Sequence, residues 1–464
     1  MSQLSAYKLI HIVGIGGAGM SAIARVLEGR GIAVQGSDRR EGPLIADLRA
    51  EGIPVVVGHA PEHVQGVDLV LASSAVPEEN PELAAARAQG TPVMRRPDFL
   101  PLLTAGYDVI AVAGAHGKTT VTGMITTVLL EAGRDPTYIV GGVVENLGTN
   151  AHAGEGPLFV IEADEYQNTF LSLEPKIAVI TNIEFDHPDS FPSPRFLRLA
   201  FGNFVEQIQA DGALVACNDD EVAHAVGACY HANGGRLRLY GNREGQALAW
   251  RAVNLRTERG GVTFDALHEG VAMGSVHLQV PGAHNALNAL AVLAVATELR
   301  VPFETVRAGL ERFAGTARRF QRLGQAAGVT VIDDYAHHPT QIRTVLDAAR
   351  QVFPEGRIIA VWEPHTFSRL RALWDDFLGA FEGADAVVIL PIYAAREVND
   401  GTLRNQDLVT ALAHPNVTAA PSLEEAVGML QRRVQAGDVV LLMGAGNEYV
   451  VGERLLEALE GEGR

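Results

Sequence analysis

The chain has 464 residues, of which 47% are hydrophobic and 20% charged, a composition typical of globular proteins, and its length predicts two to four domains. The net charge of −18 argues against a general nucleic-acid binder, because surfaces that follow a phosphate backbone need an excess of basic residues. The two cysteines, Cys217 and Cys229, do not form a CxxC pair, and an 18-residue apolar span and a convincing signal peptide are both missing, so we expect a cytoplasmic protein that is not inserted in a membrane.

The first predicted domain begins with a strand that runs into the glycine-rich sequence Gly14–Gly19, followed by a helix over Met20–Glu28. This is GxGxxG in the strand–turn–helix context in which it binds a dinucleotide, and Asp38 follows at a distance suited to a ribose hydroxyl. From the motif alone NAD is the default ligand, and another nucleotide or a ligand-free turn are the alternatives. We predict a dinucleotide-type α/β domain over residues 1–104. Its strands are predicted at Lys8–Gly14, Ala33–Gly36, Val55–Gly58 and Leu69–Ala72.

A second glycine-containing loop follows the β-branched run Val109–Ala113 and reads Gly114-Ala115-His116-Gly117-Lys118-Thr119-Thr120. Backbone N–H groups of such a turn and of the following helix can bind phosphates, the lysine adds a charge, and a threonine hydroxyl can ligate Mg²⁺. Val112 stands where the general phosphate loop has its first glycine. Lys118 is one of only three lysines in a chain rich in arginine. The sequence therefore predicts a triphosphate site here.

Two further apolar strands, Phe159–Ile161 and Ile177–Thr181, deliver acidic residues and a histidine at their carboxyl ends. Parallel sheets bind their ligands at this edge, so we expect Glu162 and His187 to meet beside the phosphate loop. Together with Thr119 they would form a suitable shell for Mg²⁺ on a nucleotide. Taken singly, each acidic residue is more typical of an ordinary strand end or helix cap.

From about residue 214 to residue 280 the sequence changes to short β-like segments with polar turns, which predicts an antiparallel insertion with little chemistry. A long apolar helix then runs from Pro281 to Leu299. Asn285 and Asn288 lie three residues apart on one face of this helix. Their amides could recognise the edge of a base, although isolated asparagines at a helix start are commonly caps.

The third predicted domain starts near Ala317 and again alternates strands with helices, which is a doubly wound pattern. Polar residues again gather at strand ends, in the runs Asp333–Pro339 and Glu363–Arg371. Paired histidines in a loop are often only structural. The strands are predicted at Val329–Ile332, Ile358–Trp362, Ala386–Leu390 and Val439–Met443.

Taken together, these motifs resemble the Mur ligases of bacterial cell-wall synthesis, over essentially the whole chain. The loop Gly114–Thr120, with its histidine and without the first glycine, is similar to the family's own phosphate loop, and residues 162–165, 182–187 and 284–288 match further family motifs in order. The resemblance implies an α/β fold of three domains. These are a Rossmann-like UDP-sugar domain (1–104), a central ATP-binding domain (105–315) and a Rossmann-like C-terminal domain (316–464).

Within the family, most of the distinctive segments are similar to the branch that joins L-alanine to UDP-N-acetylmuramate. Tyr166 and Phe185 are instead similar to the recycling branch, which attaches a ready-made tripeptide. Since the segments that favour L-alanine lie in the UDP-sugar and amino-acid regions, we expect L-alanine. A nicotinamide-dependent oxidoreductase or redox sensor is the alternative from another class, but it leaves the second loop unexplained. The segments that favour L-alanine are Gly14–Ser21, Asp334–Pro339, Pro364–Arg369 and Met443–Gly446.

The resemblance also implies the site residues. Lys118, Glu162 and His187 would be catalytic, and Thr119, Glu162 and His187 would hold Mg²⁺. We expect ATP, UDP-N-acetylmuramate and L-alanine as small-molecule partners, a monomer or homodimer, and a domain closure that completes the site. The expected ATP-binding residues are Gly114, Ala115, His116, Gly117, Lys118, Thr119, Thr120, Asn285, Asn288, Arg318, Arg319 and Asp334. The expected UDP-sugar residues are Gly16, Gly17, Ala18, Gly19, Met20, Ser37, Asp38, His59, Ser73, Ser74 and Arg96. The expected L-alanine residues are Tyr335, His337, His365 and Arg369.

Overall fold

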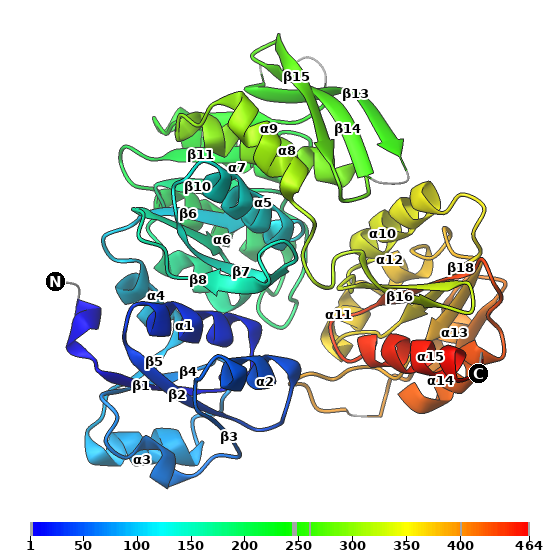
Figure 1. The fold of residues 1–464 in the computed structure, drawn as a ribbon, viewed down its shortest axis with the longest axis horizontal. Helices are drawn as coiled ribbons and strands as arrows, with labels where there is room; N and C mark the ends of the chain where they lie inside the picture. Colours follow the sequence, from blue (N-terminus) through cyan, green and yellow to red (C-terminus); the bar gives the residue numbers. More distant parts are fainter. Residues whose placement is uncertain (1–2, 244–247, 259–260, 400, 463–464) are drawn as a thin grey trace.

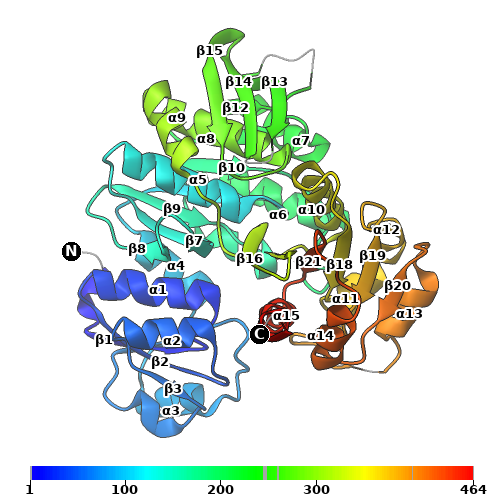
Figure 2. The ribbon, with the colours of Figure 1, turned by 45° about the vertical axis from the view of Figure 1, so that its right-hand side comes forward.

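The computed structural model describes residues 3–243, 248–258, 261–399 and 401–462. The chain forms three α/β lobes, each built on its own sheet, which confirms the predicted fold class (Figure 1). The third lobe lies beside the central one, and α10 (Pro339–Val352) contacts β13 (Trp250–Glu258) of the central sheet (Figure 2). The predicted boundaries at residues 104/105 and 315/316 stay a proposal.

The first sheet has five parallel strands in the order β3-β2-β1-β4-β5. The strand order reverses between β1 and its neighbour β4, so the glycine-rich loop after β1 lies at the switch point where such sheets bind ligands. The strands are β1 (Leu9–Val13), β2 (Ala33–Asp38), β3 (Val55–Val57), β4 (Leu69–Ala72) and β5 (Val93–Arg95). The helices are α1 (Ala18–Gly29), α2 (Pro43–Ala50), α3 (Pro81–Gln89) and α4 (Arg96–Thr104), with short 3₁₀ helices at Gln3–Ala6 and Pro61–Val64.

The central sheet has ten strands in the order β15-β14-β13-β12-β11-β10-β6-β9-β7-β8. The phosphate loop leaves β6 near the middle of this sheet, between β10 and β9. The strands are β6 (Asp108–Ala113), β7 (Thr137–Val144), β8 (Thr149–His152), β9 (Leu158–Glu162), β10 (Ile177–Ile180), β11 (Ala213–Cys217), β12 (Leu237–Tyr240), β13, β14 (Gly261–His268) and β15 (Val271–Leu278). The helices are α5 (Lys118–Glu131), α6 (Pro194–Glu206), α7 (Glu221–Ala232), α8 (His284–Glu298) and α9 (Phe303–Arg312), with a 3₁₀ segment at Tyr166–Ser172.

The predicted antiparallel insertion over residues 214–280 is wrong in its first half. β11, α7 and β12 form a parallel unit that continues the central sheet. In the second half of the segment, β14 pairs antiparallel with both β13 and β15. Every residue of β11 is buried, as expected for an interior parallel strand, whereas β15 has a largely exposed pattern. The polar turns between these strands do not distinguish the two kinds of pairing.

The third sheet has six strands in the order β16-β17-β21-β18-β19-β20, and only its edge strand β16 is antiparallel to its neighbour. The strands are β16 (Gln321–Ala326), β17 (Val329–Asp334), β18 (Ile358–Trp362), β19 (Ala386–Ile389), β20 (Val417–Ala419) and β21 (Val439–Met443). The helices are α10, α11 (Phe367–Ala372), α12 (Trp374–Leu378), α13 (Asn405–Ala411), α14 (Leu423–Gln431) and α15 (Tyr449–Glu462).

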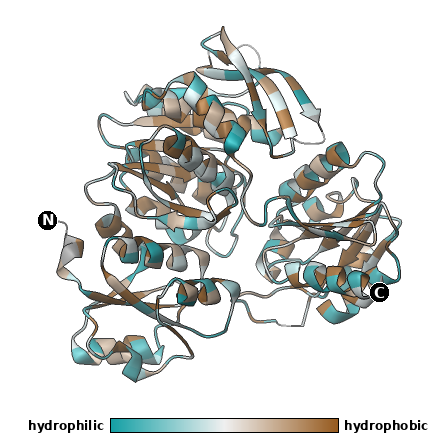
Figure 3. Ribbon diagram, viewed as in Figure 1, coloured by the Kyte–Doolittle hydropathy of each residue, from teal (hydrophilic) through white to brown (hydrophobic). Residues whose placement is uncertain are grey.

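The hydrophobic residues follow the inner strands of all three sheets (Figure 3). α8 is apolar on nearly all sides because it is buried beside α5, α9 and the sheet, and it carries Asn285 and Asn288 on its first turn. In the described ranges of the chain, no helix is both long and apolar enough to cross a membrane.

Candidate active site

The phosphate loop has a backbone that only glycine adopts easily at two positions. Gly114 has φ +139° and Gly117 has φ +82°. A Cβ atom on Gly114 would lie 2.0 Å from Oγ1 of Thr181, so a side chain does not fit there. Gly117 is the N-cap of α5 and has no side chain to cap the helix, so the N–H groups of the first turn remain suited to an anion.

The end of β10 holds this loop in place. Asn182 accepts a hydrogen bond from the backbone N–H of His116 through Oδ1 at 2.9 Å, and its carbonyl accepts one from Ala115 at 3.2 Å. The side chains of Thr181 and Asn182 both donate to the carbonyl of His116, at 2.6 and 3.0 Å. The loop is therefore preorganised by its own protein contacts.

Lys118 contacts a carboxylate that the sequence reasoning did not assign to the site. Its Nζ donates to both oxygens of Glu165, at 3.0 and 2.8 Å, and to the carbonyl of Gly114 at 2.5 Å. Burial opposes the charged form, but the nearby carboxylates of Glu165, Glu162 and Asp164 raise the pKa of Lys118. Lys118 is thus a fixed positive charge beside the loop.

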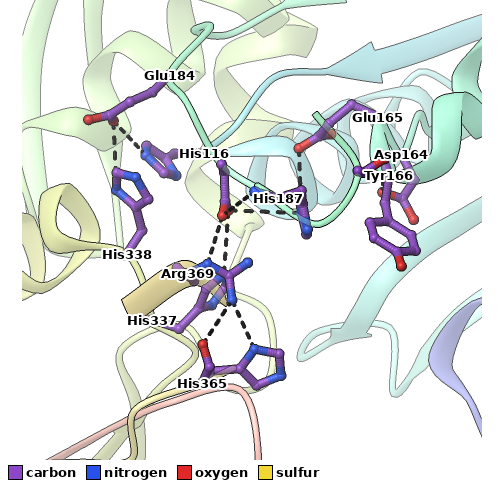
Figure 4. A network of polar contacts seen from close by, with 12 residues as sticks. His116, Asp164, Glu165, Tyr166, Glu184, His187, His337, His338, His365 and Arg369 are labelled. Carbon is purple, nitrogen blue, oxygen red and sulfur yellow. Dashed lines mark hydrogen bonds and ion pairs between the residues drawn. The ribbon is translucent and has the colours of Figure 1, made fainter. Parts of the chain in front are cut away.

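Two of the predicted metal ligands, Thr119 and Glu162, contact each other, and the third, His187, lies near two other carboxylates. Oγ1 of Thr119 donates to Oε2 of Glu162 at 2.9 Å, which places a hydroxyl and a carboxylate side by side, the oxygen ligands that Mg²⁺ prefers. Nε2 of His187 lies 4.0 Å from Glu165 and 3.8 Å from Asp186 (Figure 4). The donor types at Thr119 and Glu162 therefore fit a hard cation.

Asp186 joins the central domain to the third domain. Its Oδ1 accepts a hydrogen bond from Nε of Arg369 at 2.7 Å, and both side chains are almost fully buried. Nη1 of Arg369 donates to Nδ1 of His365 at 2.9 Å, and Nε2 of His337 lies 3.8 Å from Asp186 (Figure 4). Burial opposes ionisation of Asp186, but the positive charge of Arg369 holds the pKa of this carboxyl well below its usual range.

Both histidines beside Arg369 are neutral. Burial and the positive charge of Arg369 lower the pKa of His337 to about 3. Burial, His337 and Arg369 lower the pKa of His365 to about 2. Nδ1 of His337 donates to the carbonyl of Tyr335 at 2.8 Å, so its Nε2 is left as a hydrogen-bond acceptor.

A second contact between these domains joins His116 and Glu184 to the start of α10. One atom able to ligate a metal ion from each of His116, Glu184 and His338 lies within 4.8 Å of the other two, which is close enough for a metal site. The hydrogen bonds argue against one. The side-chain carbonyl oxygen of Gln341 accepts hydrogen bonds from the backbone N–H groups of His337 and His338. The side-chain amide N–H of Gln341 therefore donates to Nδ1 of His116 at 2.9 Å. Because Nδ1 is the acceptor, Nε2 of His116 keeps its proton and donates to Glu184 at 2.8 Å. Thr340 also donates to Glu184, at 2.6 Å. This cluster is a hydrogen-bonded domain contact.

A cavity of about 320 Å³ extends from the phosphate loop to the third domain. Its wall brings together many of the residues predicted to bind ATP. Burial raises the pKa of Asp334 to about 6, against the opposing effect of Arg319. Cys217, Asp220 and Tyr240 also line the cavity, so the segment expected to carry little chemistry contributes to it. The predicted ATP residues on the wall are His116, Gly117, Thr120, Asn285, Asn288, Arg319 and Asp334.

Arg318 does not line the cavity with Arg319. Its guanidinium pairs with Asp333 at 3.2 Å and with Glu448, and lies 5.0 Å from the ring centre of Tyr335. Its contacts are therefore within the third domain. The side chain of Met20 lies in the hydrophobic core of the first domain.

The glycine-rich loop of the first domain is tied to β2 and lies beside Arg96. Gly16 donates its backbone N–H to Asp38 at 2.9 Å. A Cβ atom on Gly19 would lie 3.2 Å from the guanidinium carbon of Arg96, so the arginine covers the start of α1. Nη1 of Arg96 contacts Asp164 of the central domain at 3.4 Å, and no described residue accepts a hydrogen bond from its buried Nε. This arrangement suits an anion between the two domains.

The other predicted UDP-sugar residues lie at the same edge of the first sheet. Ser37 and His59 both contact the buried carboxylate of Glu82. Oγ of Ser73 accepts a hydrogen bond from the backbone two residues further on, and Ser74 is exposed.

Comparison with known families agrees with this layout. The model described as the Mur ligase family catalytic domain matches residues 9–108, the Mur ligase middle domain matches residues 112–296, and the Mur ligase glutamate ligase domain matches residues 318–446. A curated UDP-N-acetylmuramate–L-alanine ligase from Frankia casuarinae is 43% identical, over 97% of both chains. The chain belongs to the Mur ligase family. An L-alanine ligase of the same name from Salinibacter ruber is 42% identical, over 99% of this chain and 97% of the relative.

Solved structures of Mur ligases are also similar. The UDP-N-acetylmuramate–alanine ligase from Thermotoga maritima matches with a TM-score of 0.82 and 30% identity, over 98% of this chain and 100% of that chain. A murein peptide ligase from Psychrobacter arcticus matches with a TM-score of 0.76 and 25% identity, over 98% and 99%. The motif-based recognition of the family is therefore confirmed.

Several residues of this Mur ligase site were missed by reasoning from the sequence. The acidic runs after β9 and β10 contain Glu165, Glu184 and Asp186. From these runs only Glu162 and His187 were predicted as site residues. Gln341 and Thr340 gave no signal of their own, because their role arises from the contact between two domains.

Proposed function

We propose that this chain joins L-alanine to the carboxylate of UDP-N-acetylmuramate in an ATP-dependent reaction that supplies a peptidoglycan precursor. The observation that carries the proposal is one continuous polar network. It runs from Lys118 of the phosphate loop through Glu165, His187 and Asp186 to Arg369 of the third domain. Figure 4 shows the part between Glu165 and Arg369. The network connects a nucleotide site to a site suited to an amino acid. A cytoplasmic location and a monomer or homodimer belong to the same proposal.

A carboxylate must be activated before an amine can attack it, because an oxide ion is a poor leaving group. In the proposed reaction a carboxylate oxygen attacks the γ-phosphorus of ATP, and ADP leaves. The amine nitrogen of L-alanine then attacks the carbon of the acyl phosphate, phosphate leaves with the activated oxygen, and the nitrogen loses a proton. Because two anions must approach each other in the first step, neutralisation of charge is expected to supply much of the rate.

The central domain would supply this positive charge. Lys118 would move from Glu165 to the β- and γ-phosphates, which the N–H groups at the start of α5 also face. One Mg²⁺, held by Thr119 and Glu162, and a second, held by His187, would supply further positive charge to the transferred group. These residues offer hydroxyl, carboxylate and imidazole donors, all of which fit a magnesium site on a nucleotide.

The cavity residues would bind the rest of ATP. Asn288 donates to Oδ1 of Asn285 at 2.9 Å, and these linked amides would contact the adenine. Arg319 would bind phosphate and Asp334 the ribose from the third domain. Since these groups come from two domains, their relative position decides whether the ATP site is complete.

The amino acid would lie among Tyr335, His337, His365 and Arg369. The guanidinium of Arg369 would attract the carboxylate of L-alanine, and Nε2 of His337 would accept a hydrogen bond from its amine. A neutral histidine suits this role because a second positive charge would repel the ammonium group. The first-domain loop Gly16–Gly19, with Ser37, Asp38, His59, Ser73, Ser74 and Arg96, would hold the UDP part.

The direct test measures phosphate release with ATP, Mg²⁺ and UDP-N-acetylmuramate, and compares L-alanine, glycine, L-serine and the tripeptide as acceptors. We expect the highest kcat/KM with L-alanine. Activity with the tripeptide alone would assign the chain to the recycling branch. Binding of NADH, with no dependence on any acceptor, would refute the ligase proposal.

A matched pair of lysine variants tests the phosphate loop. Lys118→Ala should abolish ATP-dependent phosphate release while UDP-sugar binding survives, because the two sites lie in different domains. Lys176→Ala, which removes a lysine paired with Asp211 on the surface, should leave turnover unchanged. Near-normal turnover of Lys118→Ala would refute the assignment of Lys118.

A further inference from the structure

A buried carboxylate in the first domain, Glu82 on α3, contacts polar groups from several other segments. Its Oε2 accepts a hydrogen bond from the hydroxyl of Ser37 at 2.6 Å and lies 3.1 Å from Nδ1 of His59. Its Oε1 lies 2.6 Å from Nδ1 of His63, and Nε2 of His11 lies 3.5 Å from Oε2. Ser37 and His59 are proposed UDP-sugar residues, whereas the proposed function gives Glu82 no role.

The position of the proton on the His59 ring follows from these contacts. Burial disfavours the charged form of Glu82, but the nearby ring of His11 and hydrogen bonds from Ser37 and His63 lower the pKa of the carboxyl to about 2, so it is ionised. An ionised carboxylate only accepts hydrogen bonds, so the single hydroxyl proton of Ser37 points to Glu82. Nδ1 of His59 lies 3.1 Å from both of these oxygen atoms and must therefore carry a proton. In the neutral ring, Nε2 is then a hydrogen-bond acceptor.

The free edge of His59 lies where a ligand of the first domain is expected. His59 follows β3, and Ser37 is the second-last residue of β2, so both are at the carboxyl edge of the parallel sheet. The carbonyl of Ser37 also accepts hydrogen bonds from Gly14 and Ile15, at 2.8 and 3.1 Å, at the start of the glycine-rich loop. The His59 side chain is 19% exposed, and within the described residues its Nε2 makes no hydrogen bond.

We propose that Glu82 is a positioning residue that fixes His59 in the tautomer with the proton on Nδ1, so that Nε2 accepts a hydrogen bond from a donor on the uridine part of the substrate. The proposal rests on the proposed function, in which the first domain binds UDP. Three donors on uridine have this chemistry, the imide N–H of uracil and the 2′- and 3′-hydroxyls of the ribose. Glu82 itself would not touch the nucleotide.

Binding of UDP to the full chain, measured by isothermal titration calorimetry, tests the proposal without ATP or amino acid. Glu82→Gln keeps the size of the side chain but replaces one carboxylate oxygen by an N–H donor, which removes the constraint on His59. We expect UDP affinity to fall at least tenfold. Glu62→Gln, which changes an exposed carboxylate on the 3₁₀ helix Pro61–Val64, should change the affinity less than twofold. Unchanged affinity of a folded Glu82→Gln variant would overturn the proposal.

The tautomer itself provides a readout that a purely structural role would not change. With ¹⁵N-labelled histidine in the full chain, the nitrogen shifts distinguish the two neutral forms, and the variant His59→Gln identifies the signals of this ring. We expect the Nδ1–H form in the wild type, and a gain of the Nε2–H form in Glu82→Gln. An Nε2–H form in the wild type overturns the proposal, even if Glu82→Gln does not fold.

Nucleotide analogues identify the donor. N3-methyl-UDP lacks the imide N–H, 2′-deoxy-UDP lacks the 2′-hydroxyl and 3′-deoxy-UDP lacks the 3′-hydroxyl. The analogue without the relevant donor should bind the wild type at least tenfold more weakly than UDP does, with little further loss in Glu82→Gln. Equal losses for each analogue in both proteins would overturn the proposal. If the wild type does not bind UDP at all, the proposed function fails; if it binds UDP and only the Glu82 results differ, the proposed function stands.

Discussion

Asp333 should make the third domain less stable as the pH rises through neutrality. Its side chain is 1% exposed, next to Arg318. Burial raises the pKa of Asp333 to about 7, and the neighbouring carboxylates of Glu448 and Asp334 contribute in the same direction, against the opposing effect of Arg318. The folded domain therefore binds a proton that the unfolded chain has already lost.

The sign and size of the effect follow from this difference. The pKa is about 7 in the folded state and 3.8 in the ordinary carboxyl, so the stabilisation is fully present below the lower value and is lost as the pH rises through the upper one. The whole loss is about 4 kcal/mol, of which about 1.4 kcal/mol falls between pH 6 and pH 8. For a domain of this size that loss lowers Tm by about 4 °C.

Asp333→Asn tests this reasoning because an amide does not titrate. Differential scanning calorimetry of the full chain at pH 6, 7 and 8 should show a drop in Tm that is about 4 °C smaller in the variant than in the wild type. Asp375→Asn, at an exposed position on α12 of the same domain, should keep the wild-type pH dependence. Equal drops in the wild type and in Asp333→Asn would refute the assignment, whatever the absolute stability of the variant.

Three further changes test the active site. Gly114→Ala should lower ATP affinity at least tenfold in a binding assay, because its Cβ atom would collide with Thr181; unchanged affinity would contradict the loop geometry. Arg369→Met should raise the KM for L-alanine at least tenfold. It should also lower the midpoint of thermal unfolding, because leaving the buried charge of Asp186 without its partner lowers the free energy of unfolding by about 3–5 kcal/mol. A normal KM in that variant would remove Arg369 from the amino-acid site. Chelation of Mg²⁺ should stop phosphate release, and Glu162→Gln should raise the Mg²⁺ concentration needed for half-maximal rate by about 10–100-fold; an unchanged requirement would show that Glu162 is not a ligand.

The strand ends of the fold could be predicted from the sequence because buried parallel strands are continuous apolar runs. β4, β18 and β21 begin and end at the predicted residues. The edge strand β16 was not predicted, because its mixed pattern of Gln, Arg, Leu and Gly lacks such a run. β11 and β12 were assigned wrongly for another reason, because the polar turns around them do not distinguish parallel from antiparallel pairing.

Side-chain direction in irregular segments could not be predicted. Arg318 and Arg319 are adjacent and chemically identical, yet only Arg319 lines the cavity. Arg318 has φ +59° and Phe320 has φ +51°, so neither the helical nor the strand period applies to this segment. The residues that join domains, such as Asp186 with Arg369, depend on a relative domain position that no local pattern contains.

The contact between Lys118 and Glu165 has a consequence for turnover. A polyphosphate that enters the loop must draw the ammonium group away from a carboxylate that already neutralises it. The same carboxylate is available to recapture the ammonium group when the reaction is over. In the proposed reaction Glu165 would therefore weaken the binding of ATP and of ADP to the loop alike, and an internal competitor of this kind would favour rapid release of ADP.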